Sequence, residues 1–133
     1  YVLNLSGNYT YQRALDVTNP DPSTAEGKTY KHQIAYTPRV SGSGQAVLET
    51  PWADLSYVVL FSGKRYMLGQ NIAENRLPGY TDHSVSAHRE FRWRDVSASV
   101  AVEVLNLVDK NYEIVKNFPM PGRSFRVTVD INY

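Results

Sequence analysis

The 133-residue sequence contains no cysteine, and no stretch of it approaches about 18 consecutive apolar residues. The first absence excludes a disulfide scaffold and a zinc–cysteine site. The second excludes a transmembrane helix. Neither sign of charge is in excess, because the sequence has 14 Lys and Arg against 13 Asp and Glu. The basic excess expected of a nucleic-acid-binding protein is therefore missing. The length allows one domain at most.

The last twelve residues, 122–133, alternate strictly between apolar and polar side chains. The apolar positions are Phe125, Val127, Val129, Ile131 and Tyr133, and the polar positions are Ser124, Arg126, Thr128, Asp130 and Asn132. A period of two predicts a β-strand with one apolar and one polar face. A tilted strand of about 9–11 residues spans the hydrocarbon layer of an outer membrane. The sequence therefore predicts a membrane-spanning strand that ends on an aromatic residue.

The first twelve residues follow the same rule. Their polar positions are Asn4, Ser6, Asn8, Thr10 and Gln12, and their apolar or small positions are Leu3, Leu5, Gly7, Tyr9 and Tyr11. Small uncharged side chains suit a watery lumen, and the tyrosines gather at one end of the apolar face, as in an interfacial aromatic girdle.

Four more segments have the length and alternation of strands. They are 40–49, 55–65, 81–92 and 96–105. A helix over 96–110 is the alternative for the last segment, but β-branched or small residues at every second position favour a strand. The sequence thus predicts an all-β fold of six antiparallel strands.

The predicted connections alternate in length. Long connections cover 17–32, 68–80 and 107–121, and short turns cover 50–54 and 93–95. Bacterial outer-membrane barrels have short periplasmic turns and long extracellular loops. The only two tryptophans, Trp52 and Trp93, fall in the short turns, where an interfacial belt is expected.

Three segments of the chain, 36–66, 103–113 and 119–133, carry a family resemblance. The motif residues are Asn106, Leu107, Asp109 and Tyr112, in an "NLFDxxY" element with Val108 where Phe is common, and Pro121, Gly122 and Arg123, in a "PGR" element. With these motifs the chain resembles the carboxy-terminal end of TonB-dependent outer-membrane receptors, in a Bacteroidetes-like form. Tyr133 departs from the terminal Phe that is commonest in the family, although an aromatic residue is retained.

The resemblance implies an active transporter in the outer membrane of a Gram-negative bacterium that imports a scarce, bulky ligand such as a siderophore, haem, cobalamin or glycan. It also implies a barrel of about 22 strands with a plug in its lumen. Six strands cannot close, since the smallest bacterial barrels have about eight. Residues 1–133 are therefore expected to be the carboxy-terminal portion of such a barrel, and the start at Tyr1 rather than at Met agrees with a piece of something longer.

The partners expected from the resemblance are the remaining strands and plug of the same receptor, outer-membrane lipid, and TonB through the missing amino-terminal region, with no nucleic acid. In this class of protein the alternating final strand and its last aromatic residue act as an assembly signal. Here that signal consists of Phe125, Val127, Val129, Ile131 and Tyr133.

Local motifs give no enzyme, cofactor or metal site. His83 and His88 are five apart on a predicted strand, hence on opposite faces, and His32 lies in a loop. Ser43 lacks the strand-to-helix context of a catalytic serine.

The sequence predicts where two charged residues of the strands lie. Glu103 is expected to face the lumen and to be bonded to a neighbouring strand or to the plug. Arg89 falls on the outward face, so it is expected near the periplasmic rim, where a charge is tolerated.

The alternative is a freestanding soluble β-domain, either a sandwich or a small lipocalin-like barrel that binds apolar ligands. The two hypotheses differ in the surroundings of the apolar faces. A soluble domain hides the residues from Phe125 to Tyr133 in a core, whereas a membrane barrel turns them to lipid and lines its lumen with Asn4, Asn8, Thr10, Arg126 and Asp130.

Overall fold

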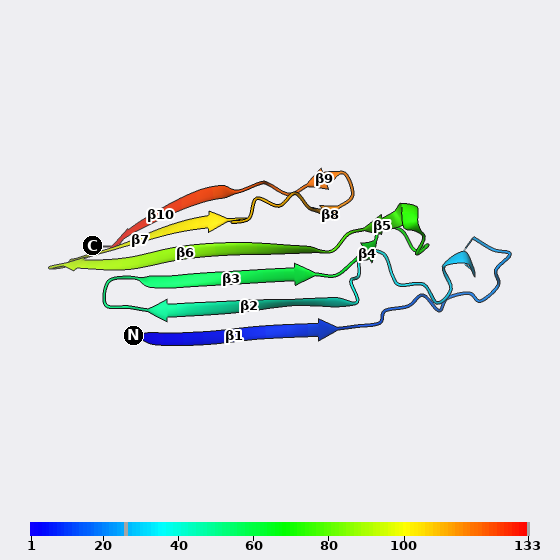
Figure 1. Ribbon diagram of the computed structural model, residues 1–133, viewed down its shortest axis with the longest axis horizontal. Helices are drawn as coiled ribbons and strands as arrows, with labels where there is room; N and C mark the ends of the chain where they lie inside the picture. Colours follow the sequence, from blue (N-terminus) through cyan, green and yellow to red (C-terminus); the bar gives the residue numbers. More distant parts are fainter. Residues whose placement is uncertain (26, 133) are drawn as a thin grey trace.

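The computed structural model describes residues 1–25 and 27–132, and its main feature is one antiparallel sheet of six long strands (Figure 1). The strands are β1 (Val2–Tyr11), β2 (Val40–Glu49), β3 (Asp54–Ser62), β6 (Tyr80–Trp93), β7 (Val96–Leu105) and β10 (Ser124–Asn132). Each strand pairs with the next long strand in the sequence, so the sheet is a simple meander. The prediction of six antiparallel strands is confirmed.

Smaller elements lie in the long connections. One two-stranded sheet joins β4 (Arg65–Tyr66) to β5 (Arg76–Leu77), and another joins β8 (Glu113–Val115) to β9 (Phe118–Pro119). The helical elements are two single 3-10 turns, η1 (Gly27–Thr29) and η2 (Ala73–Asn75). Among the described residues there is no helix with the length and apolar character needed to cross a membrane.

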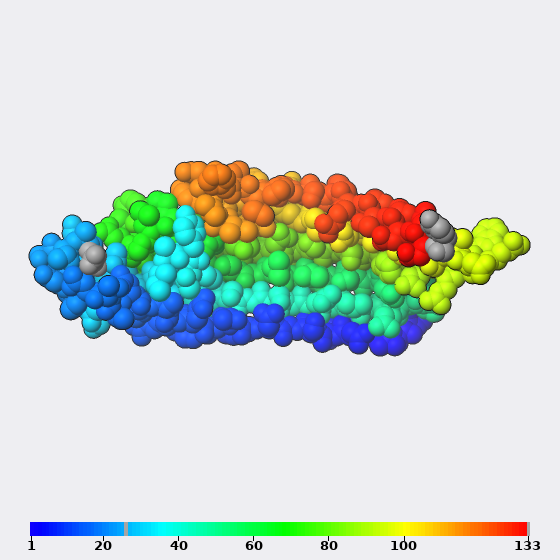
Figure 2. Space-filling model, turned by 180° about the vertical axis from the view of Figure 1, so that it is seen from behind, coloured from blue at the N-terminus to red at the C-terminus, as the bar shows by residue number. Residues whose placement is uncertain are grey.

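The two short turns, β2–β3 and β6–β7, lie at one end of the sheet, together with the start of β1 and the end of β10 (Figure 1). The three long connections lie at the other end. Figure 2 shows the same slab from behind, with these connections gathered towards one end and the β6–β7 turn forming the opposite tip. The predicted alternation of short and long connections is confirmed.

An unbroken register places the alternating side chains of all six strands on common faces. One row across the sheet pairs Leu5 with Ala46, then Tyr57, Val85, Val104 and Phe125. A neighbouring row, shifted by one residue, pairs Asn4 with Val47, then Ser56, Ser86, Glu103 and Arg126. Since successive side chains of a strand point to opposite faces, the sheet has one apolar face and one polar face.

Nothing in the described chain covers the apolar face. The side chain of Leu5 is 72% exposed and that of Phe125 is 74% exposed, and Val127, Val129 and Ile131 are exposed as well. Leu77, in a connection, is the only buried hydrophobic residue among those described. A soluble sandwich or lipocalin-like barrel would bury these side chains in a core. The described residues form one open sheet rather than two packed sheets or a closed small barrel, so the architecture expected for the soluble alternative is not present in them.

The sheet is open along both sides, because β1 and β10 are its two edges. Each edge presents a row of backbone N–H and C=O groups without strand partners.

Four of the predicted strands have boundaries that differ from the structure. The strand expected over 55–65 ends at Ser62, because Gly63 donates to Val40 O at 2.8 Å and approaches β2 too closely for a side chain, so the chain leaves the sheet there. The last strand starts at Ser124 rather than at 122, and Tyr133 lies outside the described residues. The first strand and the strand over 81–92 shift by one residue at each end, within the usual uncertainty of strand ends.

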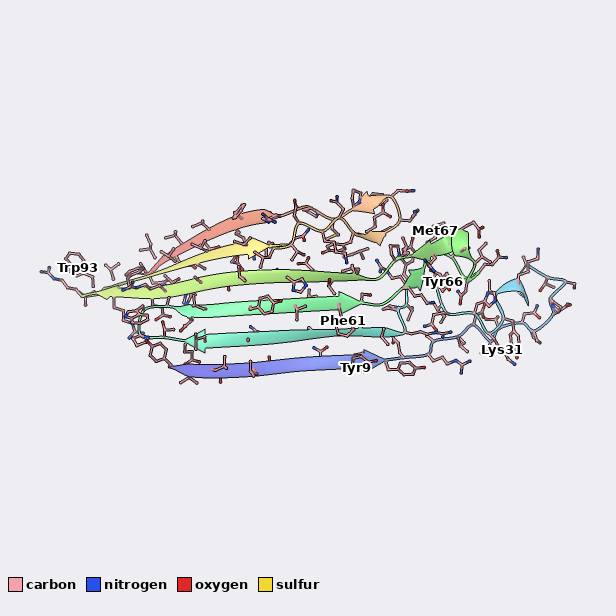
Figure 3. All side chains as sticks on the ribbon, viewed as in Figure 1. Tyr9, Lys31, Phe61, Tyr66, Met67 and Trp93 are labelled. Atoms are coloured by element: carbon pink, nitrogen blue, oxygen red, sulfur yellow. The ribbon has the colours of Figure 1, made fainter. Side chains whose placement is uncertain are left out.

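Aromatic residues lie at both ends of the apolar face (Figure 3). At the long-connection end, the rings of Tyr9 and Phe61 meet at 6.2 Å across Gly42, which pairs with both. At the short-turn end Tyr1 meets Trp52 at 5.9 Å, and Trp93 is exposed in the β6–β7 hairpin. Trp52 lies in the predicted short turn, Trp93 is the last residue of β6 and borders the other, and the predicted gathering of Tyr9 and Tyr11 at one end of the first strand is confirmed.

Gly42 provides a test of this packing. A Cβ there would lie 2.5 Å from the backbone oxygen of Asn8 and 2.5 Å from Phe61 Cε1, so Gly42→Ala must move β1 or the Phe61 ring. We expect the substitution to lower the free energy of unfolding by about 1–3 kcal/mol. Urea unfolding of the protein in detergent micelles, followed by gel mobility, measures this. Gly44→Ala is the control, because its Cβ would meet only the Val59 side chain, at 3.3 Å. Equal losses for both variants would contradict the account.

Candidate functional site

The seven motif residues all lie in the β7–β10 connection, residues 106–123, and Asn106 is the first residue of this connection. The Asn106 side chain is buried, and its Nδ2 donates to Lys110 O at 3.0 Å and to Pro121 O at 3.1 Å. Its Oδ1 accepts a bond from Lys110 N at 3.0 Å. With φ at 49° the residue has a left-handed backbone, which asparagine tolerates better than most residues. One side chain thus joins the start of the connection to its end.

Asp109 and Arg123 form a second link across the same connection. Asp109 N donates to Asn106 O at 2.8 Å, and Asp109 Oδ1 accepts from Arg123 N at 2.8 Å. The Arg123 side chain donates through Nε to Leu107 O at 3.0 Å. A Cβ on Gly122 would lie 2.9 Å from Asp109 Oδ1, so a glycine here lets the two segments approach. Since Leu107 N also donates to His83 O at 2.7 Å, the connection is fastened to β6.

Tyr112 completes the motif by packing against β6. Its ring stacks on Tyr80 at 4.3 Å with an interplanar angle of 11°, and its hydroxyl donates to Asp82 Oδ2 at 2.5 Å. Burial, together with this bond to the Asp82 carboxylate, raises the pKa of the Tyr112 hydroxyl. A raised folded-state pKa means that the contact stabilises the fold below the ordinary tyrosine pKa and is lost only as pH rises through the higher folded value.

Arg65 ties the β3–β6 connection, residues 63–79, to this motif. Its side chain is buried, its guanidinium lies 5.2 Å from the centre of the Tyr80 ring, and its Nη2 donates to Glu113 O and Ile114 O. The sequence reasoning missed Arg65, Tyr80 and Asp82, because contacts between two connections leave no periodic pattern. With these contacts, the motif residues hold the β7–β10 and β3–β6 connections against the sheet.

Four residues of the predicted assembly signal, Phe125, Val127, Val129 and Ile131, lie on the apolar face of the edge strand β10. Tyr133 is outside the described residues. An edge strand with one exposed apolar face is accessible to a partner along its whole length.

The remaining predicted residues fall on the expected faces. Glu103 and Arg126, on neighbouring strands of the polar face, form an ion pair, as expected for Glu103. Arg89 follows His88, which pairs with the first residue of β3, Asp54, so Arg89 lies at the short-turn end of the apolar face.

The three histidines do not come together. His83 is on the apolar face with Nδ1 2.6 Å from the Tyr57 hydroxyl, and His88 is on the polar face with Nδ1 3.9 Å from Asp54 Oδ2. His32 is in the β1–β2 connection, residues 12–39. No group of three potential metal ligands occurs in residues 1–25 and 27–132.

The role of Asn106 can be separated into its hydrogen bonds and its backbone conformation. Asn106→Ala and Asn106→Gly both remove three hydrogen bonds, but only glycine adopts the left-handed backbone without strain. We expect both variants to raise the rate of limited proteolysis within 106–123 in the full-length protein, and alanine to cost about 1–2 kcal/mol more than glycine. A cleavage rate unchanged from the wild type in either variant would show that the connection does not depend on Asn106.

No family model matches the sequence, and no curated protein matches it. Solved structures do match. The chain is similar to BauA, the ferric preacinetobactin receptor from Acinetobacter baumannii, at a TM-score of 0.79 and 21% identity, over 96% of this chain and 19% of that one. It is similar to the ferric citrate transporter FecA in its unliganded form at a TM-score of 0.80 and 15% identity, over 97% of this chain and 20% of that one. The chain thus spans about a fifth of these TonB-dependent receptors and has the fold of the corresponding part of their barrels.

Proposed function

We propose that the chain is a barrel segment of a TonB-dependent transporter in the outer membrane of a Gram-negative bacterium. The observation that carries the proposal is the apolar face, which extends over six strands in one register with no layer of this chain packed against it. Apolar surface of this extent is not left in water by a soluble monomer. Lipid is the environment that suits it.

Strand length and the aromatic residues agree with a bilayer. Ten residues of extended chain measure about 33 Å, and a tilt of about 40° reduces this to the roughly 25 Å of an outer-membrane apolar band. The aromatic residues described above lie at the two ends of that band, where girdles are expected. The short-turn end then faces the periplasm, and the long connections face outwards. On this assignment Arg89 lies near the periplasmic rim.

The polar face becomes the wall of the lumen. Its middle is lined by small side chains such as Ser43, Ser56, Ser84 and Ser86, which leave room for a plug. The open edges at β1 and β10 need the remaining strands of the same receptor, because unpaired backbone groups in lipid cost several kcal/mol each. TonB itself would be reached through the amino-terminal region of the same receptor. The Bacteroidetes-like form of the family rests on the sequence motifs alone.

A siderophore, haem, cobalamin or glycan is the proposed class of imported ligand. The names of the two similar structures, a ferric preacinetobactin receptor and a ferric citrate transporter, favour a ferric chelate among these. Growth of a strain lacking the gene, with each candidate supplied as the limiting nutrient, tests the transport function. Restoration of growth by the full-length gene identifies the ligand, and the mass of that gene product should be several times 15.1 kDa. A gene product with a mass of only 15.1 kDa would contradict the proposal that the chain is a segment of a larger receptor.

The orientation of the faces can be tested by cysteine labelling. Single cysteines at Thr128 and Asp130 should react with a hydrophilic thiol reagent in outer membranes once the plug is loosened, whereas cysteines at Val127 and Val129 should not. These two pairs alternate along one strand, so each is the matched control of the other. Equal labelling of both pairs would contradict a lipid-facing apolar surface.

The assembly signal gives a second test. We expect Tyr133→Ala to lower the amount of inserted receptor, because the assembly machinery of the outer membrane reads the alternating final strand and its last aromatic residue. Heat-modifiable mobility of outer-membrane extracts measures insertion. Tyr11→Ala removes an exposed tyrosine of the first strand and should have the smaller effect. Normal insertion of the Tyr133 variant would remove the signal role from this residue.

A further inference from the structure

A hollow of about 480 Å³ lies on the apolar face, in the half of the sheet nearer the short turns. It is lined by residues of β1, β2, β3, β6 and β7. Two alanines among longer side chains form its floor. Ala87 lies between Leu55 and Val102 in one row of the sheet, and Ala46 lies beside Tyr57 in the next row. The volume is within the range of small-molecule sites.

The hollow presents almost no polar group to a ligand. The hydroxyl of Tyr57 lies 2.6 Å from His83 Nδ1, so it already has a hydrogen-bond partner. The two serines of the lining, Ser56 and Ser86, belong to the polar face, so their side chains point away from the hollow. The other side chains of the lining are aliphatic. A hollow of this kind suits a hydrocarbon chain, which has no polar atom that would need a partner.

Arg89 lies directly beside this hollow. It follows Ala87 by two residues on the same strand and the same face, which is a separation of about 7 Å. The acidic residues of the six long strands all lie on the polar face, and they are Glu49, Asp54, Asp82, Glu90, Glu103 and Asp130. Among the described residues Arg89 forms no ion pair. Its positive charge on the apolar face is therefore not neutralised by the strands.

Phe91 holds the Arg89 side chain at the short-turn end. The Arg89 guanidinium lies 4.9 Å from the centre of the Phe91 ring. Since Phe91 is two residues nearer the turn, this contact directs the guanidinium away from the hollow and towards the end of the sheet where Trp93 lies (Figure 3). A ring contact covers one face of a guanidinium and leaves the N–H donors at its edge free to bind a phosphate. The cation thus lies at one end of the hollow, at the level of the aromatic residues.

We infer that Arg89 and the hollow bind one anionic glycerophospholipid, with its phosphate on the guanidinium and an acyl chain along Ala87. The two halves of such a lipid match the two halves of the site, since a phosphate complements an unpaired cation and a hydrocarbon chain complements an aliphatic hollow. A soluble phosphate has no chain to fill the hollow. The inference rests on the proposed function, which places this face in lipid and the short turns on the periplasmic side. It adds that one lipid of the periplasmic leaflet is held at a defined site.

Native mass spectrometry of the full-length protein, delipidated in neutral detergent, tests the inference. The probes are phosphatidylglycerol and phosphatidylcholine with the same acyl chains, and glycerol 3-phosphate supplies the anion without a chain. We expect one phosphatidylglycerol molecule to be retained at about fivefold lower concentration than phosphatidylcholine, because the choline cation is repelled by Arg89. Glycerol 3-phosphate should not bind.

Two pairs of variants separate the cation from the hollow. Arg89→Gln should weaken the retention of phosphatidylglycerol by about tenfold and remove the preference between the two lipids, because a bond between charged groups is lost. Arg92→Gln is its matched control, because Arg92 lies on the polar face of the same strand, 3.7 Å from Glu90. Ala87→Leu fills the floor of the hollow and should weaken the retention of both lipids by about fivefold. Its control is Val129→Leu, on the apolar face but outside the hollow.

Heat-modifiable mobility shows that each variant is folded. Equal retention of the two lipids by the wild type would overturn the inference, and so would unchanged retention of phosphatidylglycerol in Arg89→Gln or in Ala87→Leu. Binding of glycerol 3-phosphate that is lost in Arg89→Gln would overturn it too, because a soluble anion would then be sufficient. Failure of the proposed function is distinguishable, since membrane fractionation would then find the full-length protein outside the outer membrane, whatever lipid the purified protein retains.

Discussion

Antiparallel hydrogen bonding in a single register is the interaction on which the rest of this structure depends. Among the described residues only Leu77, in a connection, is a buried hydrophobic residue, so strand pairing is the main interaction that holds the six strands in relation to one another. A slip of one residue between any two strands would turn every side chain of one strand to the opposite face. The short turns at 50–53 and 94–95 prevent such a slip within each hairpin, because they leave few residues that could be redistributed. Glycine at position 42 contributes by letting β1 and β3 aromatic rings meet across β2.

The long-connection end is held in a different way. The long strands end there, and hydrogen bonds from polar side chains hold the connections in place of the backbone hydrogen bonds between strands. Asn106 closes the β7–β10 connection, and Arg65 crosses from the β3–β6 connection to carbonyl groups of the β8 segment. Asn71 does the same between the β1–β2 and β3–β6 connections, by bonding both backbone groups of Gln33. The three connections are therefore joined by side-chain to backbone hydrogen bonds in addition to a few apolar contacts, such as the stack of Tyr80 on Tyr112.

The difference between the paired strands and the side-chain-bonded connections explains how much of the structure could be predicted from the sequence. Strands, faces, turn positions and the edge strands follow from a period of two, which is a local pattern and is visible in one sequence. The end of β3 at Ser62 was missed, because it depends on how closely Gly63 approaches Val40 of another strand. The stack of Tyr80 on Tyr112 was missed for the same reason. The two residues are far apart in the sequence, and no spacing connects them.

On the proposed function, the same difference favours one end of the molecule as the place where ligand specificity arises. A bilayer restricts the apolar face to apolar side chains, and a plug-filled lumen favours small polar ones on the other face, so neither face is free to vary with the ligand. The connections are under no such restriction, and loops on a rigid scaffold are where binding residues accumulate. In this chain the connections are joined by side-chain to backbone hydrogen bonds from Asn71, Arg65 and Asn106, whereas Glu103 and Arg126 on the polar face of the sheet neutralise each other. On the proposed function the connections are therefore the first part of the molecule that a ligand meets, and the pairing of Glu103 with Arg126 leaves no unpaired charge at their position on the wall.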